Sequence, residues 1–159
     1  MVSCVSFPEI LHKLCSRNWR ELRLLPEALL LLALMRPAVL LIPFQRIAGF
    51  LGLKQTLSSP ADVSRDQSRE ADYIGWSLRA MAFRTPWESA CLTQALAGII
   101  MLQRRGIPAL LFLGVAKDEA SPQTMVAHAW LKCGNAIVTG EGGYERFTVL
   151  STFTGKKCQ

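Results

Sequence analysis

Three side chains in the C-terminal half of the sequence could together carry out acyl-transfer chemistry. Cys91 precedes a long apolar segment, His128 lies in a later one, and Glu141 follows soon after it. A thiol, an imidazole and a carboxylate that meet in space are the nucleophile, the base and the group that orients the base. The sequence therefore predicts that Cys91 attacks a carbonyl carbon, His128 moves its proton and Glu141 orients the imidazole.

Each of these residues also has a purely structural reading. Cysteine is among the residues that proteins bury most often, so Cys91 alone would more often belong to a core. Glu141 stands among glycines, where it would be an ordinary loop carboxylate. Only two histidines are present, and His128 with nearby cysteines does not match a common zinc spacing. We expect neither a metal nor a cofactor.

The segment that follows Cys91 is predicted to be a helix that ends near Arg105. Its apolar residues recur at helical spacing, and Gly106 is typical of the residue after a helix. Two starts compete, a capping box at Thr85 or a cap at Ser89, and only the second places Cys91 in the first turn. We favour the second start because the helix dipole stabilises a thiolate only there.

Strands are predicted to follow this helix. The turn at 134–135, Gly-Asn, is typical of a two-residue hairpin loop. The apolar or β-branched runs that we read as strands are 107–115, 125–133, 136–139 and 147–150. A helix followed by antiparallel strands predicts the α+β class.

The hairpin loop would also decide which residues face each other. Counting outward from it sets Trp130 opposite Thr139 and His128 opposite Glu141, close enough for a hydrogen bond. A four-residue loop would set Thr139 opposite His128 instead.

Other residues near Cys91 are candidates for the cleft. Gln94, one turn after Cys91, could stabilise an oxyanion, as could the backbone N–H of Cys91. Trp87 and Trp130 are near enough in sequence to wall the cleft, although packing is the commoner use of tryptophan.

The N-terminal third is apolar and basic. Pro37 and Pro43 interrupt its apolar run before it reaches the roughly 20 residues of a membrane span. We predict two or three short helices within residues 1–57 that cover a catalytic core of residues 58–159, in one structural unit. Seven basic residues against three acidic ones up to Lys54 favour an acidic partner. No nucleic-acid-binding motif accompanies them, and we expect no nucleic-acid partner.

Cysteine usage bears on the compartment. The five cysteines form no CxxC pair, and no signal-peptide pattern precedes them. We expect free thiols in the cytoplasm, with the apolar belt of residues 8–53 docking a partner or touching the edge of a membrane.

Four short motifs resemble the catalytic component of lasso-peptide maturation systems, the B proteins. That family has a transglutaminase-like or papain-like cysteine-protease core, and the resemblance covers about residues 70–153. The motifs are Pro86-Trp87-Glu88-Ser89-Ala90-Cys91-Leu92, Arg104-Arg105-Gly106-Ile107, Leu113-Gly114-Val115 and Ala127-His128-Ala129-Trp130-Leu131.

The resemblance implies a leader peptidase. Such an enzyme removes the leader of a ribosomally made precursor, so that an ATP-dependent cyclase can close the macrolactam ring. The implied partners are the leader region of the precursor, a small leader-recognition protein and the lasso cyclase, with the N-terminal helices as the docking surface. Cys91 and His128 match the nucleophile and base of the family. Its acid is usually an Asp at about the place of Gly140, and Glu141 is the nearest replacement.

Two other functions stay open. One is a different acyl-transfer enzyme on the same fold, such as an amidase or a transglutaminase. The other is a non-catalytic scaffold that holds precursor, recognition protein and cyclase together, for which the missing Asp is the best argument.

Overall fold

The computed structural model describes residues 19–57, 62–84, 90–119, 121 and 123–155. Four helices and a five-stranded antiparallel sheet confirm the predicted α+β class. In chain order the elements are α2 (Trp19–Leu41), α3 (Phe44–Phe50), β1 (Lys54–Gln55), α4 (Arg65–Ala82), α5 (Cys91–Gln103), β2 (Leu110–Lys117), β3 (Met125–Cys133), β4 (Ala136–Thr139), the 3₁₀ turn η1 (Tyr144–Arg146) and β5 (Thr148–Thr154).

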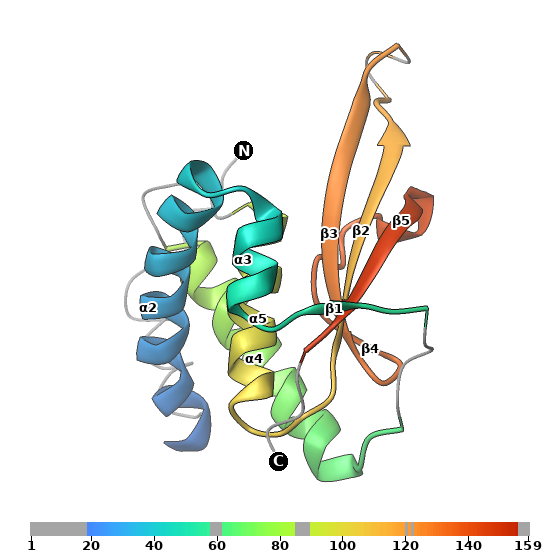
Figure 1. Cartoon of the computed structure of the whole chain (residues 1–159). Helices are drawn as coiled ribbons and strands as arrows, with labels where there is room; N and C mark the ends of the chain where they lie inside the picture. The colour runs from blue at the N-terminus through green and yellow to red at the C-terminus, as the bar shows by residue number, and fades with distance from the viewer. Residues whose placement is uncertain (1–18, 58–61, 85–89, 120, 122, 156–159) are drawn as a thin grey trace, which may run out of the picture.

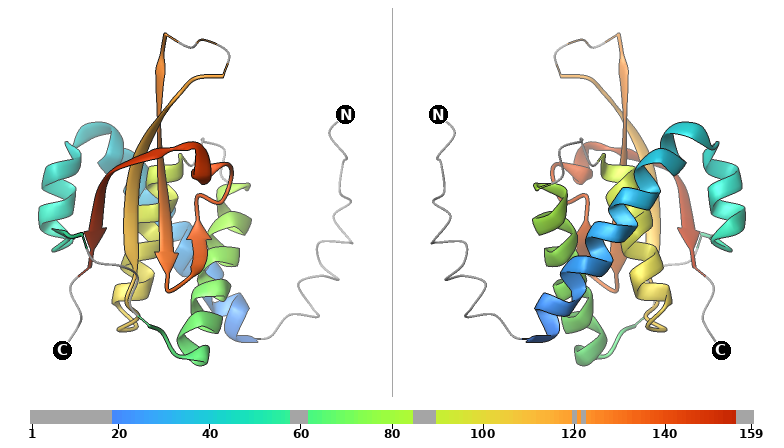
Figure 2. Two further views of the ribbon diagram at one scale, coloured as in Figure 1. Left: turned by 90° about the vertical axis from the view of Figure 1, so that its right-hand side faces the viewer. Right: turned by 90° about the vertical axis from the view of Figure 1, so that its left-hand side faces the viewer.

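The elements form layers. The strands follow the order β1-β5-β2-β3-β4, which puts β2 in the centre. Helices α4 and α5 cover one face of the sheet, and α2 lies outside them, farthest from the strands (Figure 1). On the opposite face the connection from β4 to β5 crosses the sheet, as the left-hand view of Figure 2 shows.

A single hydrophobic core joins these layers. It includes residues from α2, α4 and α5 and alternate residues of the strands, so it spans both sides of the predicted division at 57/58. Helix α5 is the most deeply buried element, with Leu96, Ile99 and Leu102 fully enclosed. The apolar stripe predicted after Cys91 is therefore what holds the cysteine-bearing helix in place.

The predicted break of the N-terminal helices at Pro37 is wrong. Helix α2 runs through both Pro26 and Pro37 for 23 residues, and the chain first turns at Pro43, the N-cap of α3. A proline inside a helix costs about 3 kcal/mol or more. Burying Leu24, Leu31 and Leu32 in the core returns roughly 1.5–3 kcal/mol each, which offsets that cost.

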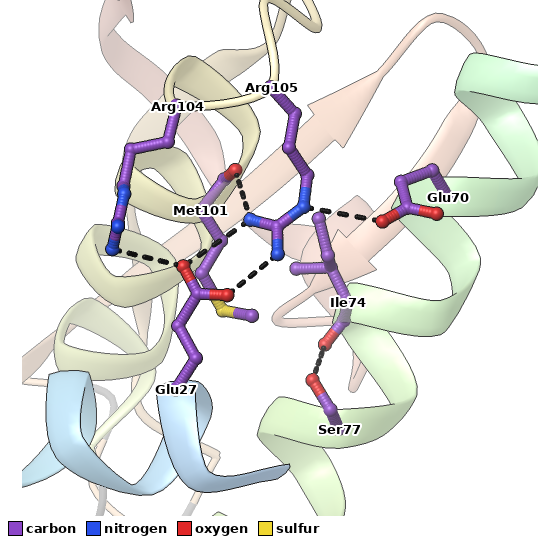
Figure 3. Close-up of polar contacts among 7 residues, drawn as sticks. All are labelled: Glu27, Glu70, Ile74, Ser77, Met101, Arg104 and Arg105. Atoms are coloured by element: carbon purple, nitrogen blue, oxygen red, sulfur yellow. Dashed lines mark hydrogen bonds and ion pairs between the residues drawn. The ribbon is translucent and has the colours of Figure 1, made fainter. Parts of the chain in front are cut away.

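Ion pairs tie α2 to the rest of the helical layer. Arg105, just after α5, binds Glu27 of α2 at 2.6 Å and Glu70 of α4 at 3.2 Å, and also donates to Met101 O (Figure 3). The hydrogen bond with Glu27 raises the pKa of the Arg105 guanidinium above its ordinary value. Arg104 adds a more exposed bond to the same Glu27 carboxylate.

The strands agree with the sequence to different degrees. Strands β3 and β4 have the predicted bounds, and Gly134 between them has φ +55°, a conformation that suits glycine. The other two predicted strands are displaced, since β2 covers residues 110–117 and β5 covers 148–154. The short β1, which pairs with the end of β5, was not predicted.

Candidate active site

Cys91 is the first residue of α5 and is half-buried. It lies in the first turn, as predicted, but the N-cap residue is Ala90 and not Ser89. Alanine has no side-chain acceptor, and among the described residues no side chain caps the first N–H groups of this helix. These N–H groups carry the positive end of the helix dipole, which favours a negative charge on a thiol or an oxyanion beside it.

His128 lies on β3 and is oriented by the main chain. Its Nε2 is 2.9 Å from the carbonyl oxygen of Gly140. A carbonyl can only accept, so Nε2 carries the hydrogen, and Nδ1 of the neutral ring keeps the lone pair that can take a proton. The ring also stacks with Trp130 and Phe147, at centroid distances of 5.9 and 4.9 Å.

Gly140 occupies the place at which the resembling family usually has its Asp. Its φ of +77° is a conformation that side-chain-bearing residues rarely adopt. A Cβ added there would collide with the carbonyl oxygen of Ala129 and with Trp130. The backbone therefore passes too close to β3 for an Asp at this position, and the Gly140 carbonyl contacts the imidazole instead.

The predicted pairing of His128 with Glu141 is wrong. In the hairpin Lys132 pairs with Ile137, but Leu131 pairs with Thr139, so Val138 is an extra, bulged residue. Strand β4 ends at Thr139, and Glu141 lies exposed beyond its end. Glu141 makes no hydrogen bond or ion pair with any residue that the structure describes.

The bulge has a partner outside the hairpin. Arg79 of α4 donates from Nη1 to the carbonyl oxygen of Val138 at 3.0 Å. In the same contact, Gly75 of α4 lies so close to Val138 O that a Cβ would sit 2.5 Å from it. Helix α4 thus approaches the edge of β4 and contacts the residue that shifts the register.

The structure brings Cys91 and His128 to neighbouring elements but not into a hydrogen bond. On β3, Leu131 faces α5, where its side chain lies beside Gly98. Strand alternation places His128 with Trp130 on the other face. No hydrogen bond links the Cys91 thiol to the imidazole, both of which are described. Bringing the thiol and the imidazole together therefore requires a rearrangement of these elements and not only the shortening of an existing hydrogen bond.

The remaining cleft candidates have different surroundings. Trp130 is 3% exposed and stacks on Phe112 at 5.5 Å, so it packs against the sheet and does not wall an open cleft. Gln94 is half-buried on α5, one turn after Cys91. Trp87 lies outside the described residues, as do Thr85 and Ser89.

Thr139, the alternative partner of His128, does not serve that role. It is fully buried, and its methyl group points toward Gly98 of α5. Its hydroxyl has no hydrogen-bond partner among the described residues. The residues around His128 that sequence reasoning missed are Phe147 and the Gly140 carbonyl. The available signal was Gly140 itself, a glycine where the family has an acid.

Cys133 has the properties of a structural thiol. It is fully buried, and burial, followed by the charge of Asp72, raises its pKa from 9.0 to about 11. It therefore stays protonated at neutral pH and is a poor nucleophile. Among the described residues, no group of three His, Cys, Asp or Glu side chains is placed to hold a metal ion.

One comparison with known proteins gave a match. The family model described as the transglutaminase-like superfamily matches residues 31–152, which include the second half of α2, the cysteine helix and nearly all of the sheet. Neither the curated proteins nor the solved structures yielded a match.

Proposed function

The chain belongs to the transglutaminase-like superfamily, and we propose that it is a cysteine peptidase that removes the leader from a lasso-peptide precursor. The superfamily includes cysteine peptidases and acyltransferases, which share attack of a thiolate on a carbonyl carbon. The choice of a peptidase and of its substrate rests on the four sequence motifs that resemble the lasso-peptide B proteins.

The observation that carries the proposal is the place of Cys91. It is the first residue of a helix whose core-facing residues are buried and whose N-terminal N–H groups have no side-chain cap from any residue that the structure describes. The thiol is half-buried, so it is neither sealed in the core like Cys133 nor freely solvated. A thiolate gains stability at that end of a helix, and the same N–H groups can bind the oxyanion of a tetrahedral intermediate.

The proposed reaction begins with proton transfer from the Cys91 thiol to Nδ1 of His128. The thiolate attacks the carbonyl carbon at the end of the leader, and a tetrahedral intermediate forms. The C–N bond then breaks, and the amino group of the core peptide takes the proton from His128. The leader stays on the sulfur as a thioester until water, deprotonated by His128, releases it as a carboxylic acid.

The geometry adds one requirement to this mechanism. Because His128 lies on the face of β3 opposite to α5 and no hydrogen bond links it to Cys91, the mechanism requires a rearrangement that brings the imidazole and the start of α5 together when the precursor binds. In the proposed system a small leader-recognition protein delivers the precursor, and the lasso cyclase consumes the product.

Mass spectrometry of a precursor incubated with this chain and its recognition protein tests the function. We expect two fragments whose masses sum to that of the precursor plus one water. Cys91→Ala should give no fragments, whereas Cys133→Ala, the matched control, should still cleave. An acyl product that carries an added amine in place of water would contradict the peptidase and indicate a transglutaminase.

A scaffold without catalytic activity is the second candidate. Two observations favour it: the thiol and the imidazole share no hydrogen bond, and Gly140 takes the place of an acid. If the chain is a scaffold, the Cys91→Ala variant should still hold precursor, recognition protein and cyclase together as well as the wild type does. In the wild-type scaffold, the Cys91 thiol should be alkylated no faster than a free thiol at neutral pH. An enzyme should show faster alkylation of Cys91 that is slowed by His128→Ala.

A further inference from the structure

The outer side of α2 carries an uninterrupted apolar ridge. Its exposed positions recur every three or four residues along the helix, which places them on one side. Leu41 is 81% exposed and Leu30 60%, values far above those of the inner side. Among the α2 residues whose exposure the structure describes, Arg23 is the only exposed one that is not apolar; the ridge consists of Trp19, Pro26, Leu29, Leu30, Leu34, Pro37, Leu40 and Leu41.

The ridge faces away from the rest of the molecule. Helix α2 is the layer farthest from the sheet, and it crosses in front of the other elements in the right-hand view of Figure 2. Past Leu41, the exposed residues include Ile42, before the turn, and Arg46 and Phe50 on α3. Phe50 is 92% exposed. A surface of this kind on a soluble domain marks an interaction site.

The inner side of α2 prevents the helix from leaving the fold. By length and composition, residues 22–41 could cross a membrane. However, Ala28 and Leu32 are fully buried in the core, and Glu27 is bound to Arg105 (Figure 3). A crossing would pull these residues away from α4 and α5. While the domain is folded, α2 can only lie along a surface.

The charged residues near the ridge indicate what kind of surface the ridge would bind. No Asp or Glu occurs between Ala28 and Ala61, whereas Arg36, Arg46 and Lys54 are all cationic. Arg36 is half-buried and Arg46 is exposed. From Ala28 onward, the charged side chains of α2 and α3 are therefore all positive, which suits an apolar phase with an anionic surface. A second copy of the chain would instead bring cations against cations.

The N-terminal end of the ridge carries two side chains that also suit a membrane surface. Trp19 is 67% exposed, and the guanidinium of Arg23 lies 5.7 Å from its ring centroid. Tryptophan and arginine are side chains that favour the level of the lipid headgroups, where an apolar body and a polar end are both accommodated.

We propose that the α2 ridge binds the surface of an anionic lipid bilayer, with the helix axis parallel to the membrane plane. The leucines of the ridge enter the boundary between headgroups and acyl chains, while Arg36 and Arg46 contact lipid phosphates. The domain then stays folded on the cytoplasmic side of the contact, and no segment of α2 crosses the bilayer. This inference concerns a surface distinct from the Cys91 site and does not depend on the proposed function.

Co-sedimentation with vesicles tests the proposal on the full chain. We expect the wild type to bind phosphatidylcholine vesicles containing about 30% phosphatidylglycerol at least about tenfold more tightly than phosphatidylcholine alone. Binding should weaken as sodium chloride rises from about 0.05 M to about 0.5 M, because salt screens the phosphate contacts. Alkaline carbonate should release the bound protein.

Two pairs of variants locate the contact. Leu34→Glu with Leu41→Glu should abolish binding, whereas Val149→Glu with Leu150→Glu, equally apolar and exposed positions on β5, should preserve it. Arg36→Gln with Arg46→Gln should weaken binding to anionic vesicles about tenfold, and Arg69→Gln with Lys117→Gln, which has the same net charge, should not. Circular dichroism establishes that each variant is folded.

Three results would overturn the proposal. The first is equal binding to neutral and anionic vesicles, or none to either. The second is unchanged binding by Leu34→Glu with Leu41→Glu. The third is resistance to carbonate extraction, which would make α2 a membrane span. A dimer that dissociates in the same double variant, without vesicle binding, would assign the ridge to a second copy, and solubilisation by a recognition protein alone would assign it to a protein partner.

Discussion

The imidazole of His128 is held by a main-chain atom, the carbonyl oxygen of Gly140, at 2.9 Å from Nε2. A carbonyl fixes the tautomer as a carboxylate would, but it carries no full charge with which to stabilise the imidazolium. No side-chain substitution at Glu141 can remove this contact, because it belongs to the backbone. This contact determines what substitutions at Glu141, at Gly140 and at His128 itself should do.

Substituting Glu141 should have little effect on catalysis. The side chain is exposed and the bulge at Val138 moves it out of register with His128. We expect Glu141→Gln and Glu141→Ala to retain the wild-type cleavage rate within about threefold, as measured by precursor turnover under single-turnover conditions. A loss beyond about tenfold in both variants would show that the carboxylate reaches the imidazole during the reaction.

Substituting Gly140 should destabilise the fold. A left-handed residue with a side chain costs roughly 1–3 kcal/mol, and the added Cβ would also meet Ala129 O. We expect Gly140→Ala to lower the free energy of unfolding in urea by at least about 2 kcal/mol, and Gly140→Asp to lower it further. Gly142→Ala is the matched control, because a Cβ there meets nothing within 4 Å. If Gly140→Ala and Gly142→Ala were equally stable, a side chain at position 140 would not be strained.

Cys91 and His128 should act as a unit. If His128 activates the thiol, Cys91→Ala and His128→Ala should each reduce turnover to the background rate, and the double variant should be no slower than either. Nitrogen NMR of the imidazole should find Nε2 protonated in the neutral ring. Additive losses in the double variant would mean that the two residues contribute independently.

Cys133 should make stability depend on pH in the alkaline range. Its pKa is about 11 in the folded state, above its ordinary 9.0, so the unfolded chain loses the proton first. The stabilisation is complete below pH 9 and is lost between pH 9 and 11, by about 2 kcal/mol. Other groups titrate there too, so the measurement is the difference in unfolding free energy between wild type and Cys133→Ala. The difference should become smaller as the pH rises from 9 to 11. A difference that stays constant over this range would contradict the raised pKa of Cys133.

Arg105 should contribute more to stability than its neighbour Arg104. Arg105 is 25% exposed and binds both Glu27 and Glu70, whereas Arg104 is 65% exposed and binds Glu27 alone. Arg105→Met should cost about 1–3 kcal/mol in urea unfolding, since it leaves half-buried carboxylates without their partner. Arg104→Met, with the same change of charge, should cost at most about 1 kcal/mol. If the two variants lost similar amounts of unfolding free energy, the two arginines would stabilise the fold only through their net charge.

Local signals predicted the parts of the fold that depend on local interactions. Gly134-Asn135 placed the hairpin, and β3 and β4 have the predicted bounds because the turn itself requires those residues. The apolar spacing after Cys91 likewise predicted a buried helix, whereas the place of the thiol in the first turn was chosen between two competing starts because it suits the chemistry. In both cases the residues that decide the structure are neighbours in sequence.

The failures come from contacts between distant segments. The register beyond Lys132 changes at Val138, whose carbonyl is bound by Arg79, 59 residues earlier. Helix α2 continues past Pro37 because the inner side of the same helix is buried against α4 and α5. No window of sequence contains both partners of such a contact, so the partner of His128 could not be deduced from spacing alone.

The contact of α4 with Val138 also limits how a peptide can bind. An extended chain can join a sheet as an extra strand only where an edge offers free main-chain groups. At the β4 edge, the Val138 carbonyl is already occupied by Arg79, and Gly75 brings the helix backbone against the same atom. β-Augmentation at β4 is therefore closed both to a substrate and to a second sheet. A peptide that joins this sheet as a strand has to do so at another position, such as the edge strand β1 or the part of β3 before Leu131 that β4 does not pair with.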